Sequence, residues 1–300
     1  MVEDTKCTKV ININGIIIKA LSGFYYVSDG ENIYETRARG IMRKNGVTPL
    51  VGDNAVIQFE SGSAVLDQIV DRKNAMVRPP VANVDKLYII SSFSSPAPNT
   101  LIIDKLIGQC ESKGIEPVIV FNKCDMGSFE EYENIYRNAG FQVFSVSCLT
   151  GEGIEELKAS FGEGISVLTG NSGVGKSSLI NAMFDEYELK TGEISTKLGR
   201  GKHTTRHCEL FSNGNGGFIA DTPGFATVES ERMSKDKVAA SFREFADYVD
   251  DCRFTSCSHT CEKGCAVIDA VNAGKISQSR HDSYCAIYKD CSAINEWELK

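Results

Sequence analysis

The chain has 300 residues, 42% of them hydrophobic and 24% charged, and a formal net charge of −8. This length allows about two or three domains of ordinary size, and the hydrophobic content is too high for a disordered chain. The acidic balance argues against a protein that binds polyanions over its whole surface. Any contact with nucleic acid must come from local patches, and residues 1–80, with 10 Lys and Arg against 9 Asp and Glu, are the best candidate.

The sequence shows no basic and apolar leader, and the longest apolar run near the start, residues 16–18, is far too short to span a bilayer. We therefore expect a cytoplasmic protein. Six of the eleven cysteines lie after residue 250, and four of these fall between Cys252 and Cys265. In a cytosolic protein such local crowding indicates a metal site before it indicates disulfides.

The first part of the chain, residues 1–72, is predicted to be an all-β domain. Short β-branched or aromatic runs are separated by turn residues such as those at 28–30 and 51–53. The runs occupy residues 16–20, 24–27, 32–38 and 55–59. About five short strands in such a length suit a small barrel of the OB type, which often binds oligonucleotides. An SH3-like barrel used for protein contacts fits the pattern equally well.

Residues 73–80 are predicted to be a linker, because Pro79 and Pro80 cannot sustain a central strand or a helix. From residue 81 to 228 the pattern alternates between strands and helices, which indicates an α/β domain. Its continuous apolar runs are typical of strands buried on both faces of a parallel sheet. The predicted strands are 87–90, 118–121, 142–146 and 165–168, and the predicted helices are 99–113 and 154–161. Residues 229–300 are helical and rich in cysteine.

A phosphate-binding loop of the form G-x4-G-K-S follows the strand predicted at residues 165–169 and opens a helix, the setting that this motif requires. Its members, with the serine that follows them, are Gly170, Asn171, Ser172, Gly173, Val174, Gly175, Lys176, Ser177 and Ser178. Backbone N–H groups and the start of the helix form a cradle for phosphate. We expect Lys176 to reach the β- and γ-phosphates and the Ser177 hydroxyl to bind Mg²⁺.

An NKxD motif, formed by Asn122, Lys123 and Asp125, follows the buried strand at 118–121. The two oxygens of Asp125 match the ring N–H and the exocyclic amine of guanine, whereas adenine would leave them unpaired. We expect Asn122 to tie the motif to neighbouring loops and Lys123 to cover the base. Ser147, at the end of the next strand, stands where GTPases place a backbone contact to the guanine oxygen.

The order of the two motifs is inverted. In an ordinary GTPase the phosphate loop comes first and the guanine motif last, but here NKxD at 122–125 precedes the loop at 170–177. The chain therefore reads as a circularly permuted P-loop GTPase that uses GTP and GDP with Mg²⁺.

A DxxG switch motif ends the strand predicted at residues 218–220. Asp221 would hold Mg²⁺ through water, and the Gly224 N–H would sense the γ-phosphate. The loop at residues 199–206, between the phosphate loop and DxxG, contains Thr204 and Thr205, which could bind Mg²⁺. Phe225 stands where many GTPases have a glutamine that orients the attacking water, and a phenylalanine cannot do so. His203 is the nearest candidate replacement, although a surface histidine without catalytic duty fits equally well.

Cys252, Cys257, His259 and Cys265 form the pattern C-x4-C-x-H-x5-C. Three thiolates and one imidazole suit a closed, structural zinc site. Cys261 falls inside the span and could replace one ligand. Cys285 and Cys291 are expected to be core or surface thiols. The stretch 277–289, with Arg280, Tyr284 and Tyr288 at helical spacing, is expected to pack beside this metal lobe.

These motifs together resemble the YjeQ/RsgA family of circularly permuted ribosome-assembly GTPases over nearly the whole chain. The shared features are the barrel segment from Arg39-Gly40 to Gly52-Asp53, NKxD, GNSGVGKS, a GxGxHTT loop, DTPG with a hydrophobic successor, and the cysteine and histidine pattern. The resemblance implies an N-terminal OB barrel, a permuted GTPase core and a C-terminal lobe with one zinc ion. It also implies GTP hydrolysis stimulated by the small ribosomal subunit, and a role in the late maturation of that subunit.

We accordingly expect the small subunit and its rRNA as partners, and a monomer that does not bind membranes. Two other functions remain open: a permuted GTPase that acts on another RNA particle or on transfer RNA, and a scaffold that binds GTP without hydrolysing it. Because DxxG leads directly into the zinc lobe in the permuted order, movement of the switch could pull on that lobe.

Overall fold

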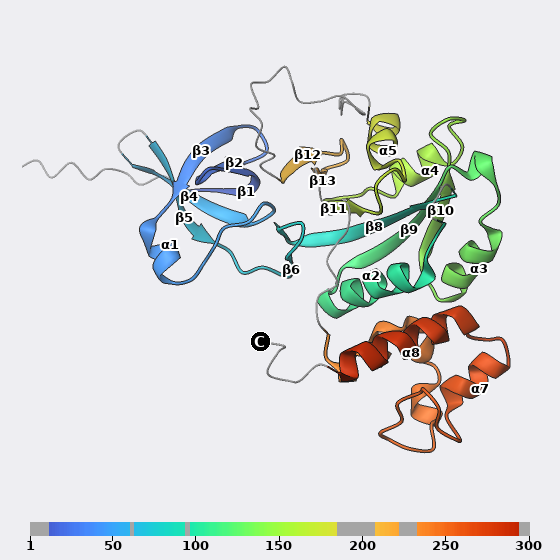
Figure 1. Ribbon diagram of the computed structural model, residues 1–300. Coiled ribbons are helices and arrows are strands. Elements are labelled where there is room, and N and C mark those ends of the chain that lie inside the picture. Colours follow the sequence, from blue (N-terminus) through green and yellow to red (C-terminus); the bar gives the residue numbers. More distant parts are fainter. Residues whose placement is uncertain (1–11, 61–62, 94–96, 185–207, 222–232, 294–300) are drawn as a thin grey trace, which may run out of the picture.

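The computed structural model describes residues 12–60, 63–93, 97–184, 208–221 and 233–293. Figure 1 shows a β-barrel on one side, a central α/β domain, and a helical lobe beneath helix α2 of that domain. Among the described residues, no helix is both long enough and apolar enough to cross a membrane.

The barrel is closed by five strands, in the order β1-β2-β3-β5-β4, with β4 returning to pair with β1. The strands are β1 (Asn12–Leu21), β2 (Phe24–Ser28), β3 (Ile33–Ala38), β4 (Asn54–Glu60) and β5 (Ser63–Ile69), with the short helix α1 (Gly40–Lys44) after β3. Ile17, Ile57 and Leu66 are fully buried inside it. This five-stranded closed barrel is the predicted OB type.

Residues 73–80, which were expected to be a linker, form part of a small hairpin. Strands β6 (Ala75–Met76) and β7 (Val81–Ala82) pair antiparallel within and just after it, and both prolines lie in the turn between them. Asn83 Nδ2 donates to the Gly52 carbonyl at 2.9 Å. The sequence pattern could not reveal this pairing, because strands of two residues are too short to show an alternating pattern.

The central sheet has the strand order β10-β9-β8-β11-β13-β12, in which the first five are parallel and β12 is antiparallel. Its strands are β8 (Val84–Ser92), β9 (Glu116–Asn122), β10 (Gln142–Val146), β11 (Gly164–Thr169), β12 (Glu209–Ser212) and β13 (Gly217–Asp221). Strand β11, which leads into the phosphate loop, is central. Earlier strands lie on one side of it and later ones on the other, as a permuted chain requires.

Helices cover both faces of this sheet (Figure 1). One face packs against α2 (Thr100–Lys113) and α3 (Glu130–Asn138), through buried residues that include Ile103, Ile107 and Tyr136. The other packs against α4 (Ile154–Ala159) and α5 (Lys176–Met183), through residues that include Leu157 and Leu179. The strands are therefore buried on both faces, which explains their continuous apolar runs.

The barrel and the central domain share one sheet. Strand β1 pairs with β12 at Lys19 and Glu209, whose side chains form an ion pair of 2.8 Å. Ile16, Ile18 and Ala20 of the same strand pack against the core of the α/β domain. The barrel is thus joined to the central domain by main-chain and apolar contacts as well as by the chain itself.

The C-terminal lobe is a set of short helices around its own apolar core, which includes Phe242, Phe245 and Tyr284. Its elements are α6 (Lys235–Val238), the 3-10 turns η2 (Ala239–Ser241), η3 (Arg243–Phe245) and η4 (Val249–Asp251), α7 (Ala266–Asn272) and α8 (Gln278–Ser292). Helix α8 lies along α2 of the central domain (Figure 1).

A buried ion pair fastens this lobe to the central domain. Arg280 in α8 is 1% exposed and donates to Asp104 in α2 at 2.6 Å and to Glu244 at 2.6 Å. Its guanidinium also lies 4.4 Å from the ring centroid of Phe242. Burial raises the pKa of Asp104, and the neighbouring arginine acts in the opposite direction. Without Arg280 the carboxyl group would be buried with no cation beside it.

Replacing Arg280 with alanine is therefore expected to weaken the contact between α8 and α2 by about 3–5 kcal/mol, because Asp104 would lose its buried partner. Faster amide hydrogen exchange in α8 would report the loss. The matched control is Arg243→Ala. Arg243 also pairs with two carboxylates, Glu111 and Glu116, but is 31% exposed, so its removal should cost about 1 kcal/mol or less. Equal effects of the two changes would contradict this account.

Candidate nucleotide site and metal centre

The predicted nucleotide-binding residues meet at one edge of the central sheet. Parallel strands β9, β10 and β11 end there with Asn122, Val146 and Thr169, so the segments that follow them lie side by side. Ligands of open α/β sheets bind at this edge, beyond the carboxyl ends of the strands.

The phosphate loop joins β11 to α5 and needs glycine at two tight positions. Gly170 has φ +148°, and a Cβ there would lie 2.3 Å from the Ile90 carbonyl oxygen. Gly175 has φ +97°, and a Cβ there would lie 2.3 Å from Asn122 Nδ2. Only glycine fits both positions without displacing the backbone or the asparagine. Val174 between them is buried and anchors the loop in the core.

The start of α5 brings a cation and hydroxyl groups together. Lys176 Nζ donates to the carbonyl oxygens of Gly170 at 2.6 Å and Asn171 at 3.0 Å, which holds the ammonium over the loop. Partial burial lowers the pKa of Lys176. Ser177 and Ser178 are exposed in the first turn of the helix, as are Ser172 and Gly173 in the loop. This set can bind a phosphate chain and offer an oxygen to Mg²⁺.

The NKxD residues are bonded to the phosphate loop. Buried Asn122 donates from Nδ2 to the Val174 carbonyl at 2.8 Å, and its Oδ1 accepts the Lys123 N–H at 2.8 Å. Lys123 has a left-handed φ of +66° and donates from Nζ to the Gly173 carbonyl at 3.0 Å. Two segments about fifty residues apart in the chain therefore form one rigid unit.

Ser147 makes a side-chain contact that the sequence did not predict, while its backbone N–H donates to the Glu152 carbonyl at 3.0 Å. Its side chain is buried and donates from Oγ to Asp125 Oδ1 at 2.5 Å, while the same oxygen accepts the N–H groups of Leu149 and Thr150 at 3.2 Å. The exposed carboxylate of Asp125 is thereby held in one orientation. Residue type alone could not assign this contact, because it depends on where β10 ends relative to β9.

The predicted catalytic residues are only partly described. Asp221 is the last residue of β13, and its backbone pairs with Glu209 of β12. His203, Thr204, Thr205, Gly224 and Phe225 lie outside the described residues.

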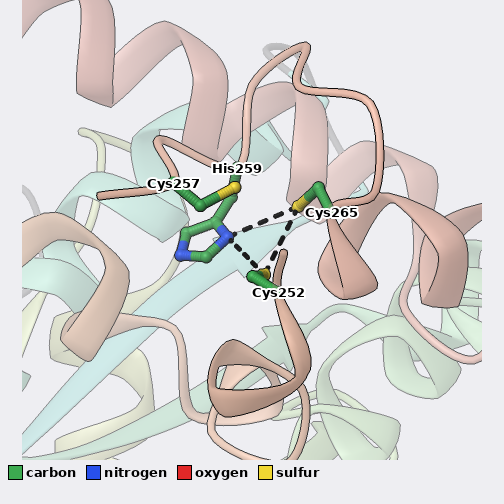
Figure 2. Close-up of side chains that lie close together, drawn as sticks. All are labelled: Cys252, Cys257, His259 and Cys265. Atoms are coloured by element: carbon green, nitrogen blue, oxygen red, sulfur yellow. Dashed lines mark hydrogen bonds between the residues drawn. The ribbon is translucent and has the colours of Figure 1, made fainter. Parts of the chain in front are cut away.

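The predicted metal ligands do come together in the C-terminal lobe. The ligand atoms of Cys252, Cys257, His259 and Cys265 all lie within 4.8 Å of one another (Figure 2). The Sγ atoms of Cys252 and Cys265 are 3.9 Å apart, and His259 Nδ1 is 3.5 Å and 3.4 Å from them. Zn–S bonds of about 2.3 Å at tetrahedral angles place sulfur atoms about 3.8 Å apart, so the cluster has the dimensions of a zinc site. Cys261 is exposed and is not part of this group.

Other side chains hold the ligand loop in place. His281 Nε2 in α8 donates to the His259 carbonyl at 2.8 Å, and the Tyr284 hydroxyl donates to the Ser258 carbonyl at 2.7 Å. The predicted packing of this helix beside the metal lobe is thus confirmed.

Glu262 accepts three N–H groups, from Ser258, Thr260 and Cys261. Partial burial acts against ionisation, but hydrogen bonds from Ser258 and backbone N–H groups lower the pKa of Glu262 to about 2.

Comparison with known proteins agrees with this geometry. The RsgA GTPase family model matches residues 69–231, and the RsgA N-terminal domain model matches residues 14–65. A protein of Caldanaerobacter subterraneus subsp. tengcongensis named small ribosomal subunit biogenesis GTPase RsgA is 46% identical over 93% of this chain and 95% of its own length. The protein of the same name from Geobacillus thermodenitrificans is 45% identical over 90% and 94%.

Two solved structures are similar over nearly their whole length. YjeQ from Thermotoga maritima has a TM-score of 0.79 and 31% identity, covering 95% of this chain and all of that one. YloQ, described as a circularly permuted GTPase, has a TM-score of 0.78 and 34% identity, covering 94% and 96%. The fold and the site thus define a circularly permuted GTPase, an enzyme that binds guanine nucleotide and hydrolyses GTP. The chain belongs to the RsgA GTPase family.

The geometry of the metal cluster leads to a prediction about its ligands. Cys257→Ala should lower the zinc content of the purified protein well below one per chain, because one of four ligands is lost. Cys261→Ala, the matched control, should keep full zinc, since this thiol lies outside the cluster. Metal analysis of both variants checks this. Full occupancy in Cys257→Ala with loss in Cys261→Ala would show that the ligand set is wrong.

Proposed function

We propose that this protein binds GTP with Mg²⁺ at the edge of the central sheet and hydrolyses it when bound to the small ribosomal subunit, whose late maturation it assists. The observation that carries the nucleotide site is the bond from Asn122 Nδ2 to the Val174 carbonyl, which sets the base-binding and phosphate-binding segments at a fixed separation. The curated relatives named as small-subunit biogenesis GTPases support the choice of particle.

In this proposal each segment has a separate task. Asp125, oriented by Ser147, accepts the two N–H groups of guanine, and Lys123 covers the base. The loop N–H groups and Lys176 bind the phosphates, and Ser177 offers its hydroxyl to Mg²⁺. Asp221, Thr204 and Thr205 complete the Mg²⁺ site, and the Gly224 N–H senses the γ-phosphate. His203 orients the attacking water in place of the missing glutamine. Bound Mg²⁺ would neutralise charge on the β- and γ-phosphates.

The metal centre is proposed to hold one structural zinc ion. Four protein ligands fill a tetrahedral coordination sphere and leave no position open for a substrate. The His281 and Tyr284 bonds to the ligand loop come from α8, the helix that also carries Arg280. Zinc would therefore keep the loop in the shape in which its two carbonyl groups meet this helix.

The proposed organisation is an OB barrel to residue 72, a connecting segment to residue 80, the GTPase domain to residue 228 and the zinc lobe beyond it. We propose rRNA of the small subunit as the partner, with the barrel as the best candidate for the contact, and a cytoplasmic monomer as the working form. The sharpest test of the partner is GTP hydrolysis measured alone, with purified small subunits and with purified large subunits.

Guanine specificity is expected to depend on Asp125. Asp125→Asn should weaken GTP binding and improve binding of xanthosine triphosphate, because the new amide donates where guanine also donates. Competition between the two nucleotides measures the change. Ser147→Ala is the matched control: it keeps the carboxylate but not its orienting bond, so affinity for GTP should fall without a gain for xanthosine triphosphate. A wild-type preference in Asp125→Asn would exclude this residue as the base-binding group.

Hydrolysis by the free protein is expected to be slow and to rise by about 100-fold or more on the small subunit, which corresponds to roughly 3 kcal/mol of barrier. Phe225 stands in place of the glutamine that usually orients the attacking water, so the subunit must complete the site. His203→Ala should keep GTP binding and blunt the stimulated rate. Fast hydrolysis without any particle, or equal stimulation by large subunits, would contradict the proposal and favour another RNA partner. A normal stimulated rate in His203→Ala would exclude only the histidine.

A further inference from the structure

An apolar pocket lies between helix α2, strand β8 and the phosphate loop. It holds about 510 Å³ of space, part of which is open to solvent, and its walls include Ile102, Ile103 and Leu106 of α2 and Gly170 and Val174 of the loop. Ile102 is 45% exposed. Helix α2 covers one face of the sheet and α5 the other, so the pocket reaches the loop from the face opposite to α5. An apolar pocket that stays open in the described part of the chain indicates a further apolar group that covers it.

The pocket also contains a buried polar group that needs a partner. Thr169, the last residue of β11, lines the pocket and is 1% exposed, and its hydroxyl has no hydrogen-bond partner among the described residues. Buried polar side chains are nearly always hydrogen-bonded. An occupant made only of hydrocarbon would leave this hydroxyl unpaired, whereas a peptide brings backbone N–H and C=O groups together with its side chains. The pocket therefore fits a peptide segment that carries an apolar side chain.

The chain leaves the central sheet beside this pocket. Strand β13 runs parallel to β11 with Val167 opposite Ala220, so Asp221 is level with Leu168, one residue before Thr169. The described chain resumes at Met233, whose Cε would lie 3.4 Å from a Cβ placed on Gly108 of α2. Residues 222–232, which lie outside the described residues, therefore connect a point beside Thr169 to a point on α2. The pocket is bounded by these same two elements.

Phe225 is the only aromatic residue of this connection, whose other apolar residues are Pro223, Ala226 and Val228. It comes four residues after Asp221. An extended chain advances about 3.3–3.6 Å per residue, so the backbone of Phe225 has a range of about 14 Å from the end of β13. A phenylalanine ring also buries a large apolar area on entering a pocket. The position and the side chain of Phe225 thus select it as the occupant.

We propose that Phe225 occupies this pocket and anchors the DxxG segment beside the phosphate loop. Gly224, the preceding residue, is then held where its N–H meets the γ-phosphate. The pocket walls Gly170 and Asn171 carry the carbonyl groups that accept from Lys176 Nζ, so the anchored ring lies against the backbone that positions this lysine. Phe225 is in this way a positioning residue and does not orient water. The role of Gly224 rests on the proposed function.

Fluorine NMR of the full-length protein tests the position of the ring. 4-Fluorophenylalanine is placed at position 225, and the protein is bound to Mg²⁺ and a GTP analogue that it cannot hydrolyse. The signal should differ in shift from that of the unfolded protein and should resist broadening by a soluble paramagnetic reagent. Ile102→Asp should move it toward the unfolded position and expose it to the reagent, because a charge would then stand in the pocket wall.

Ile41→Asp is the matched control, because Ile41 is 58% exposed and lies in α1 of the barrel. It should leave the fluorine signal unchanged. A signal at the unfolded position in the otherwise unchanged protein, or an equal response to Ile41→Asp and Ile102→Asp, would overturn the inference. Protection that grows with protein concentration would assign the pocket to a second copy of the chain and would also overturn it.

Nucleotide affinity tests the positioning role. Phe225→Ala should weaken binding of GTP relative to GDP by about 5-fold or more, because Gly224 contacts only the γ-phosphate. Phe225→Leu should restore most of the preference. Adding Ile102→Asp to Phe225→Ala should cost little more, since both changes remove the same contact. Loss of GDP affinity to the same degree as GTP affinity would indicate a merely structural effect and would contradict the proposal.

The two proposals fail separately, because these measurements use the free protein. If small subunits neither bind the protein nor stimulate it, the proposed function is wrong. A fluorine signal that is protected in the pocket and released by Ile102→Asp would still support the place of Phe225. An exposed ring in a protein that small subunits do stimulate would overturn this inference alone.

Discussion

The hydrogen bond from Asn122 to the Val174 carbonyl is the constraint on which the rest of the molecule depends. It holds together two segments whose order in the chain is the reverse of the usual one. The strand that leads into the phosphate loop lies inside the sheet, with earlier strands on one side of it and later strands on the other. The two motifs therefore meet in space although their order in the chain is inverted.

The permutation also decides where the other two units attach. The barrel leads into β8, inside the sheet, and the C-terminal lobe follows β13, which is next to the phosphate-loop strand. Each unit then gains a second contact with the central domain. The barrel gains the pairing of β1 with β12, and the lobe gains the ion pair between Arg280 and Asp104. Both accessory units are therefore held to the central domain at a second point.

Sequence reasoning succeeded where the signal was local. Continuous apolar runs identified the buried strands, because a strand covered on both faces needs apolar residues at every position. The four predicted metal ligands lie within fourteen consecutive positions, so their spacing predicted the cluster that the structure brings together. Sequence reasoning failed where the two partners of a contact are far apart in the chain. The ion pair of Arg280 with Asp104 joins residues 176 positions apart, and the bond of Ser147 to Asp125 depends on how two strands end beside each other.

Helix α2 links these features, because it packs against the sheet on one side and against the C-terminal lobe on the other. The described chain leaves β13 at Asp221 and resumes at Met233, whose Cε would lie 3.4 Å from a Cβ placed on Gly108 of α2. Four residues away on the same helix, Asp104 binds Arg280. The chain that follows β13 therefore comes back into contact with the helix that carries the buried ion pair. Since a buried ion pair tolerates little separation, the lobe must move with α2 as one body or lose the pair altogether. A displacement of α2 would therefore move the C-terminal lobe as well, without any contact between the nucleotide and residues 252–265.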